Sequence, residues 1–389
     1  MKREHEPRLA ARMASIEPFH VMDVQARAHA LEAQGRRIVH MEIGQPDFGA
    51  PPQVAEAAIA AIRTRRLGYT ASAGLPALRE AIARHYREQL GADVPAERIV
   101  VTTGASGALL LGLGVLLNPG DEALMPDPCY PCNRHFVRLF DAVPRTLAVD
   151  ERQSYQLSAA DVRSAWTGAT RCVMLATPSN PTGTLIEPGA LREIVDETRR
   201  RGGTVVVDEI YQGLVYGRAP STALSIADDV FVVASFSKYF NMTGWRLGWI
   251  VVPERYVREV EKLAQNVAIC PPAPSQHAAL AAFRPDTLAL LEERRAEFER
   301  RRDFMVPALR RLGFRIPLVP EGAFYIYAGC ERFGDSWDLA LGLLERAGVA
   351  ITPGIDFGSN RPRDHVRFAY TRALPDLEEG VAAMARALA

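Results

Sequence analysis

Lysine is scarce in this sequence, and one lysine has surroundings suited to covalent chemistry. Of the 46 basic residues only three are lysines, at positions 2, 238 and 262, and the other 43 are arginines. The lysine amine can lose its proton and attack a carbonyl carbon, whereas arginine stays protonated. Lys2 is terminal and Lys262 lies in a charged, helix-like stretch, but Lys238 lies among small, aromatic and hydroxyl residues in ASFSKYFNMTGWRLGW. Lys238 is therefore the candidate Schiff-base lysine; the alternative is a surface lysine that escaped replacement by arginine.

A carboxylate ends another apolar run, VVVDEIYQGL. Burying the Asp208 carboxylate at the end of a strand is costly unless a cation pairs with it, and a protonated pyridine nitrogen is such a cation. Tyr211 follows three residues later, close enough to contact the same ligand. The alternative is that Asp208 caps a helix.

Three further segments could hold the phosphate and oxygen atoms of such a ligand. In VTTGASGALLLG a strand enters a glycine-rich turn and then a helix, whose first amides, near Ser106, can bind phosphate. Ser235 and Arg246 add a hydroxyl and a guanidinium fork. In ATPSNPTGT, Asn180 can direct its amide into a crevice, although a simple turn is the alternative, and its bond to Pro181 is a candidate for the cis form.

These groups match one ligand. A phosphorylated pyridine aldehyde needs an anion cup, a carboxylate at its ring nitrogen, hydrogen bonds at its phenolic oxygen and an amine at its aldehyde. The glycine-rich loop also resembles the nucleotide loop of short-chain dehydrogenases, but no Tyr-x-x-x-Lys follows it.

The elements that position these residues indicate an α/β protein. Helical periodicity is present at 20–35 and 53–66, and short apolar strands then alternate with helices, which predicts a mainly parallel seven-stranded sheet between helices. The strands are expected at 99–103, 122–125, 145–149, 172–176, 204–207, 231–235 and 248–252. Ligands collect at the carboxyl ends of such strands.

After about residue 280 a long charged helix, TLALLEERRAEFERRRDFMVPALRRL, precedes short strands expected at 314–317, 323–327, 350–352 and 365–369. This pattern predicts a smaller α+β domain at 280–389, with which the N-terminal segment 1–45 packs. Residues 46–279 would form the large cofactor-binding domain, because 389 residues are too many for one simple core.

Composition excludes several other classes. The formal net charge is zero, so no general binding to nucleic acid or to a membrane surface is expected. No secretory signal is recognised and the longest apolar run, 108–117, is too short to span a bilayer, so a cytoplasmic location is expected. The five cysteines are an odd number, and the Cys129–Cys132 pair lacks a second pair at zinc spacing, so neither a disulfide scaffold nor a metal site is expected.

The order of these motifs resembles the class I/II aminotransferases of fold type I, the aspartate aminotransferase family. The resemblance covers nearly the whole chain and rests on IGQPDFGAP, LGYTASAGLPALREAI, the loop at 104–107, PDPCYPC, SNPTG, VVDEIYQGL, SFSKYFNMTGWRLGW and HVRFAY. It implies pyridoxal 5′-phosphate (PLP) as cofactor, an amino acid and a 2-oxo acid as substrates, and a homodimer.

The resemblance also implies a role for each matching residue. Lys238 would form the internal aldimine and move the proton, and Asp208 would keep the ring nitrogen protonated. Tyr211 and Asn180 would bind the phenolic oxygen, and Tyr130 would stack on the ring. The phosphate would be held by Ala105, Ser106, Ser235, Arg246 and, from the second subunit, Tyr69. Arg367, helped by the Gly44 backbone, would bind the substrate carboxylate.

The sequence therefore predicts a PLP-dependent aminotransferase with a ping-pong mechanism. A PLP-dependent C–S β-lyase on the same fold is the main alternative; a PLP-binding regulator and a nicotinamide dehydrogenase are less favoured. No motif supplies the second-subunit arginine of dicarboxylate-specific members, which leaves the amino donor open. Arg134 and His135 could line the pocket, although a solvated loop is favoured for both.

Overall fold

The computed structural model describes residues 8–64 and 67–389. Lys2, and the last two residues of the helix predicted at 53–66, lie outside the described residues. The centre of the fold is a seven-stranded sheet in the order β2-β8-β7-β6-β5-β3-β4. Its strands are β2 (Ile99–Thr102), β3 (Glu122–Asp127), β4 (Val143–Ala148), β5 (Thr170–Ala176), β6 (Thr204–Asp208), β7 (Phe231–Ser235) and β8 (Gly248–Val251).

The prediction of a mainly parallel sheet is confirmed. Strands β3 to β7 pair in parallel, and only β8 runs antiparallel to both of its neighbours, β2 and β7. Every residue of β6 and β7 is buried, as expected of apolar strands that are covered on both faces. The carboxyl ends of β5, β6 and β7 therefore lie side by side, which brings the motifs that follow them together.

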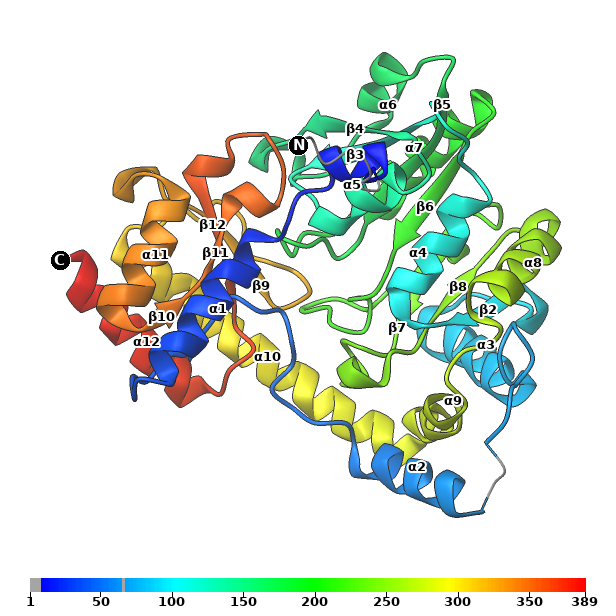
Figure 1. Cartoon of the computed structure of the whole chain (residues 1–389), viewed down its shortest axis with the longest axis horizontal. Helices are drawn as coiled ribbons and strands as arrows, with labels where there is room; N and C mark the ends of the chain where they lie inside the picture. Colours follow the sequence, from blue (N-terminus) through cyan, green and yellow to red (C-terminus); the bar gives the residue numbers. More distant parts are fainter. Residues whose placement is uncertain (1–7, 65–66) are drawn as a thin grey trace, which may run out of the picture.

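Helices cover both faces of this sheet (Figure 1). The helices α4 (Gly104–Gly114), α5 (Pro131–Arg138) and α8 (Val257–Ala268) pack into one core, and α3 (Pro76–Leu90), α6 (Ala159–Ala165) and α7 (Pro188–Arg200) pack into the other. Helix α4 is apolar on nearly all sides because it is buried against β7 and β8. Two further helices, α2 (Pro52–Thr64) and α9 (Ala273–Ala279), pack against each other.

The chain ends fold together around a second, smaller sheet. This antiparallel sheet has the order β11-β12-β9, and a short parallel pair joins β1 to β10. Helix α1 (His20–Glu32) contacts α11 and β11, and α12 contacts β1. The remaining elements are β1 (Val39–His40), β9 (Tyr325–Gly329), β10 (Val349–Ala350), β11 (Thr352–Pro353), β12 (His365–Ala369), α11 (Ser336–Ala347) and α12 (Leu374–Leu388).

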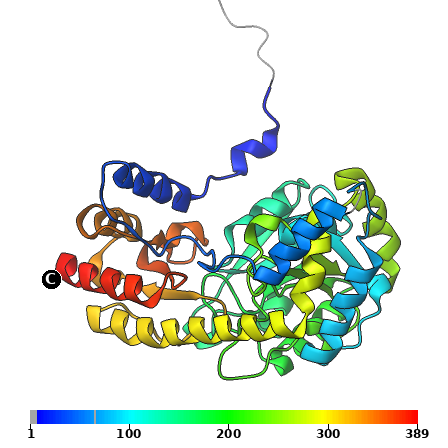
Figure 2. The same cartoon turned by 90° about the horizontal axis from the view of Figure 1, so that it is seen from below.

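Helix α10 (Pro285–Leu312) spans both sheets, as Figures 1 and 2 show from two directions. It begins at a proline, which needs no intrahelical partner there, and ends before Gly313 in a left-handed conformation. The predicted division at residues 45 and 280 stays a prediction.

Two predicted C-terminal strands were wrong in detail. Residues 314–317 form only an isolated bridge between Arg315 and Gly329, and Pro317 has no N–H with which to extend a ladder. The strand predicted at 350–352 is instead two strands, β10 and β11, which pair with different partners.

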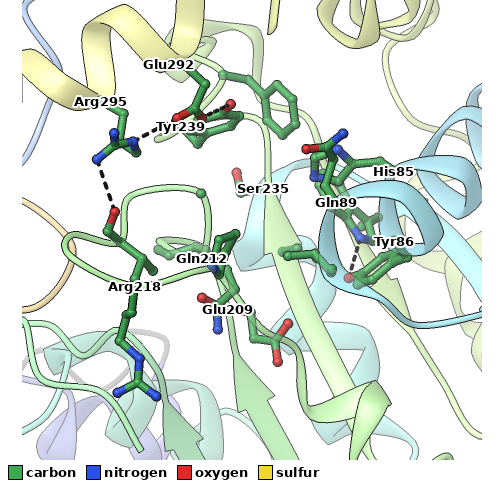
Figure 3. Close-up of a pocket in the computed structure, with 18 of the residues that line it drawn as sticks. His85, Tyr86, Gln89, Glu209, Gln212, Arg218, Ser235, Tyr239, Glu292 and Arg295 are labelled. Atoms are coloured by element: carbon green, nitrogen blue, oxygen red, sulfur yellow. Dashed lines mark hydrogen bonds and ion pairs between the residues drawn. The ribbon is translucent and has the colours of Figure 1, made fainter.

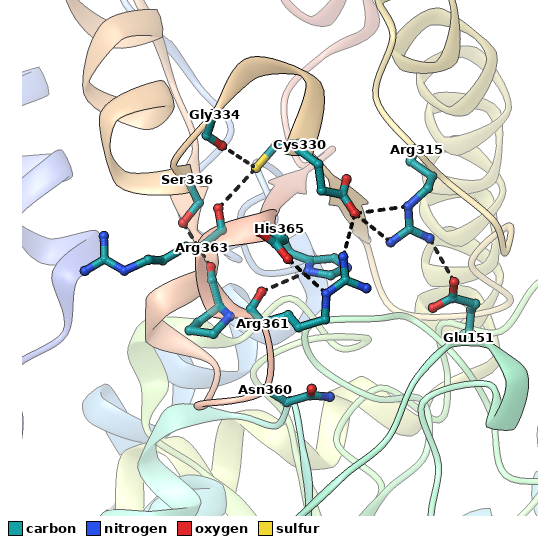
Figure 4. A network of polar contacts seen from close by, with 12 residues as sticks. Glu151, Arg315, Cys330, Gly334, Ser336, Asn360, Arg361, Arg363 and His365 are labelled. Atoms are coloured by element: carbon teal, nitrogen blue, oxygen red, sulfur yellow. Dashed lines mark hydrogen bonds and ion pairs between the residues drawn. The ribbon is translucent and has the colours of Figure 1, made fainter.

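A polar network joins the small sheet to the large one (Figure 4). Arg315, which follows α10, donates to Glu151 at 2.9 Å, and it shares the carboxylate of Glu331 with Arg361. Nearby, Asn360 donates its amide to the carbonyls of Asp127 and Val149, at the ends of β3 and β4. These contacts hold the 354–364 loop beside the carboxyl edge of the large sheet.

Backbone segments pack closely at Gly248, where β7, β8 and α4 meet. A Cβ there would lie 2.7 Å from the Ala234 carbonyl oxygen, 2.7 Å from the carbonyl carbon of Gly104 and 2.9 Å from the Ala105 nitrogen. All three are backbone atoms. The start of β8, the end of β7 and the start of α4 can therefore lie in contact only because residue 248 has no side chain.

We expect Gly248→Ala to destabilise the protein by about 1–3 kcal/mol. The new methyl group would clash with backbone atoms, which cannot move aside as the end of a flexible side chain can. Chemical denaturation would measure the loss. The control is Gly189→Ala in the first turn of α7, where a Cβ meets nothing within 4 Å and alanine should stabilise the helix by about 0.5–1 kcal/mol. Equal stability of the two variants would contradict this packing.

Candidate active site

A cavity of about 350 Å³ lies at the carboxyl edge of the large sheet, below helix α1 and the small sheet. It gathers residues from segments more than 300 positions apart in sequence. Of the residues singled out from the sequence, those that line it are Gly44, Ala105, Ser106, Tyr130, Asn180, Asp208, Tyr211, Ser235, Lys238, Arg246 and Arg367. Of the residues to which the family resemblance gives a role, Tyr69 alone does not line it, and its side chain is 82% exposed.

Lys238 follows β7 and extends its amine across the cavity. Its Nζ donates a hydrogen bond to the Gly44 carbonyl oxygen at 2.7 Å. Burial, helped by the positive charges of Arg367 and Arg246, lowers the pKa of Lys238 to about 8, against the opposing effect of Asp208. About a tenth of this amine is thus unprotonated at pH 7, far more than for an ordinary lysine, and a nucleophilic lysine has to be unprotonated.

Asp208 is the last residue of β6 and its carboxylate is buried. It accepts a hydrogen bond from the Ile210 amide at 3.1 Å, and burial raises its pKa to about 6. Within the described part of the chain, no arginine or lysine forms an ion pair with it. A buried carboxylate in this state offers a place for a cationic ligand atom.

An anion cradle forms where β7, β8 and α4 meet. Arg246 has a positive φ of 50°, uncommon for a non-glycine residue, and its guanidinium donates to the hydroxyl of Ser237 at 3.4 Å. Gly104, at the start of α4, also has a positive φ, and a Cβ there would lie 2.7 Å from Nη2 of Arg246. The space beside this guanidinium and the first amides of α4 is therefore kept open, as a bound phosphate needs.

Arg367, in β12, points into the cavity from the small sheet. Its Nη1 donates to Asn180 Oδ1 at 2.9 Å, and its Nη2 donates to the Glu42 carbonyl at 2.6 Å and to the Thr352 hydroxyl at 3.1 Å. Its Nε is buried without a partner. An unpartnered donor on a buried guanidinium suits a carboxylate ligand. The predicted cis bond between Asn180 and Pro181 is present.

Sequence reasoning missed Tyr325, in β9. Its hydroxyl pairs with that of Tyr211 at 2.9 Å, and the Arg367 guanidinium lies 4.2 Å from its ring centroid. A Cβ on Gly44 would lie only 1.7 Å from this hydroxyl, so the glycine is needed for the approach. The alternation in AFYIYAG indicates a buried strand, but nothing local indicates that Tyr325 faces a ligand.

Arg134 and His135 do not line the cavity. Arg134 instead donates to the Asp356 carbonyl at 3.2 Å, and His135 lies beside Arg138. The walls come instead from apolar residues of distant segments: Phe19, Val21, Met22, Ile43 and Phe357. Cys129 and Cys132 are free thiols.

A larger cavity, of about 420 Å³, lies behind the same strand ends (Figure 3). Glu209, Gln212 and Tyr239 line it. Each of them directly follows a residue that lines the candidate site, namely Asp208, Tyr211 and Lys238. The Tyr239 hydroxyl donates a hydrogen bond to Glu292 of α10 at 2.6 Å. The larger cavity shares only Ile210 and Ser235 with the smaller cavity and has neither the lysine nor the anion cradle. The chemistry is therefore placed in the smaller cavity.

Comparisons with known proteins agree with this site. The family model for aminotransferase class I and II matches residues 36–384. The chain is 38% identical over 371 residues, 95% of both proteins, to the valine–pyruvate aminotransferase of Mycobacterium tuberculosis. A solved aminotransferase from M. tuberculosis superposes with a TM-score of 0.94 at 37% identity, covering 98% of this chain and 99% of that one. The aspartate aminotransferase from Thermus thermophilus with maleate superposes with a TM-score of 0.92 at 30% identity, covering 98% and 100%.

The fold and site define a transaminase of the fold type I class. The chain belongs to the class I and II aminotransferase family, and its cofactor is pyridoxal 5′-phosphate. The residues present fit that cofactor, because the cradle beside Gly104 would be filled by a single Cβ and the Asp208 carboxylate lacks a cation. Within the described ranges, no helix has both the length and the apolarity to cross a membrane.

The lowered pKa of Lys238 predicts how its reactivity depends on pH. Because only the unprotonated amine reacts, acylation of Lys238 in the cofactor-free protein should rise with a midpoint near pH 8. Peptide mass spectrometry would measure it, with the exposed Lys262 as internal reference. A midpoint near the ordinary lysine value, about 10.4, would contradict the described environment.

Proposed function

We propose that Lys238 is the covalent attachment point of the cofactor and the group that moves the substrate proton. The chain is an aminotransferase, and the proposal concerns which residues do the chemistry and on which substrates. The observation that supports it is the Lys238 amine, partly unprotonated at neutral pH, in one cavity with a buried carboxylate and an anion cradle.

When bound, PLP supplies an electron-withdrawing ring that stabilises negative charge at the substrate Cα. Asp208 would keep a proton on the ring nitrogen, because its carboxylate is ionised above about pH 6. Tyr211 and Asn180 would donate hydrogen bonds to the phenolic oxygen. Ser235, Arg246 and the amides of Ala105 and Ser106 would hold the phosphate, with Tyr130 against the ring.

Lys238 would take the proton from the substrate Cα and deliver it to the neighbouring cofactor carbon. Its present hydrogen bond to the Gly44 carbonyl shows how far the amine reaches toward the substrate side of the cavity. Arg367 would bind the α-carboxylate, helped by the Gly44 backbone. Two half-reactions, with an L-amino acid and then a 2-oxo acid, make up the ping-pong cycle.

We further propose an amino donor with an uncharged, apolar side chain. The cavity has three cations among the described residues: Lys238 for the cofactor, Arg246 for the phosphate and Arg367 for the α-carboxylate. Of these three, none is left for a second carboxylate, and the wall nearest α1 is apolar, with Phe19, Val21 and Met22. The relative named for valine and pyruvate supports this choice.

The proposal includes a homodimer with Tyr69 reaching the phosphate of the second subunit. In a single chain the aromatic side chain of Tyr69 is 82% exposed to solvent, and a second subunit would cover it. The cytoplasmic location expected from the sequence is kept as part of the proposal.

Lys238→Ala should lose about 10²–10⁴-fold in transamination rate, because the group that transfers the proton is removed. Lys238→Arg should lose as much, since it keeps the positive charge but not the removable proton. Rates with saturating donor and acceptor would be compared with those of Lys262→Ala, which changes an exposed lysine on α8. Activity of Lys238→Ala within tenfold of the unchanged protein would reject the assignment.

A panel of amino donors tests the substrate class. With the cofactor-loaded enzyme and no acceptor, valine, methionine or phenylalanine should each release one equivalent of 2-oxo acid per subunit and then stop. Aspartate and glutamate should react more slowly. Continuous release of pyruvate and ammonia from a sulfur-containing amino acid would instead indicate the C–S β-lyase, and preference for aspartate would contradict the apolar donor.

A further inference from the structure

A group of metal-ligand side chains lies outside the candidate active site, where α1 meets β1. His29 and Glu32 are three residues apart on the last turn of α1, so their side chains share one helix face. His40 ends β1 and faces them. One ligand atom from each of the three lies within 4.8 Å of the others.

Within this group, the carboxylate of Glu32 lies between the two imidazoles. Its Oε2 is 2.9 Å from His29 Nδ1, and its Oε1 is 3.0 Å from His40 Nε2. The two rings are 5.7 Å apart between centroids. A small movement of these side chains would bring one atom of each to a common cation about 2.0–2.2 Å away.

A buried carboxylate behind His40 provides a second and independent observation. Glu42 is fully buried and its Oε1 lies 2.7 Å from His40 Nδ1, whereas its Oε2 has no hydrogen-bond partner among the residues that the structure describes. A carboxylate that binds one ring nitrogen places the proton there, so the opposite nitrogen, now 3.0 Å from Glu32 Oε1, could bind a cation in place of that contact. Glu42 lines the same surface hollow, of about 290 Å³, as His29 and His40.

We propose that His29, Glu32 and His40 bind a divalent zinc-type cation, with Glu42 orienting His40. Two imidazoles and one carboxylate favour zinc and its neighbours in the first transition series over magnesium or calcium, which take oxygen ligands. The hollow also contains Asp47 and Arg372, whose formal charges are opposite. The site is independent of the proposed catalytic roles.

The position of the site gives the metal a structural consequence. Val21 and Met22 in the first turn of α1, with Phe19 just before it, line the candidate active site, and the last turn of α1 carries the proposed ligands His29 and Glu32. The Glu42 carbonyl accepts the hydrogen bond of Arg367. A bound cation would cross-link α1 to β1 and so hold this wall and the Arg367 partner in place, which should raise the melting temperature.

Zinc alone is the probe for the experiment. The cofactor-loaded enzyme, freed of metal, is titrated with Zn²⁺ in competition with a chromophoric chelator. We expect one high-affinity Zn²⁺ per subunit, weakened at least tenfold in His29→Gln and in Glu32→Gln, both exposed positions. His20→Gln is the matched control, since it changes the same residue type at the other end of α1, and it should bind as the unchanged protein does.

Two further measurements identify the ligands. Glu42→Gln should weaken binding by about 10–100-fold, as loss of an orienting carboxylate does. Co²⁺ should give visible d–d bands that vanish in His29→Gln. Unchanged affinity in both the His29 and Glu32 variants, loss of binding in a Cys129→Ser, Cys132→Ser variant alone, or no stoichiometric binding at micromolar protein would each overturn the proposal.

Discussion

The site depends on charges that are kept out of water at the carboxyl ends of β6 and β7. Among the described residues, Asp208 is buried without an ion-pair partner, and the partly buried Lys238 lies near two arginines, so the ionised form of each is destabilised. Both side chains are held in place because Asp208 ends β6 and Lys238 follows β7, which are apolar strands covered on both faces. A ligand with a cationic ring nitrogen would pair with the Asp208 carboxylate, and its phosphate would offset the positive charge near Lys238. The cofactor and the fold are therefore suited to each other.

Much of this arrangement could be predicted because the residues follow strands. A parallel sheet aligns the carboxyl ends of its strands, so Asn180, Asp208 and Ser235 had to lie close together once the strands were recognised. The scarcity of lysine left three candidates for the nucleophile, and the small, aromatic and hydroxyl residues around Lys238 singled it out among them. The parts that could not be predicted come from folding at long range: Tyr325 and Phe19 meet the site through the small sheet and α1, and no local pattern in the sequence fixes that docking.

The same limit applies to two other groups of side chains. Arg134 lies next to the Tyr130 motif, yet α5 turns its guanidinium toward the Asp356 carbonyl and away from the cavity. The expectation of no metal site considered cysteine spacing and stays a prediction, whereas the histidine group proposed as a cation site is assembled from a helix end and a strand joined by a turn. The three-residue spacing indicates that His29 and Glu32 share a helix face, but only the fold brings His40 and the buried Glu42 to them.

Gly248 brings three backbone segments together at the cofactor side of the cavity, and no larger side chain fits there without moving the anion cradle. The opposite wall is built from Phe19, Val21 and Met22, at and just before the start of α1, together with Ile43 and Phe357. Changes of these side chains can therefore adapt the site to a new amino donor, while the half that holds the cofactor keeps its shape. The residues that would contact the substrate side chain are thus separate from the residues that hold the cofactor.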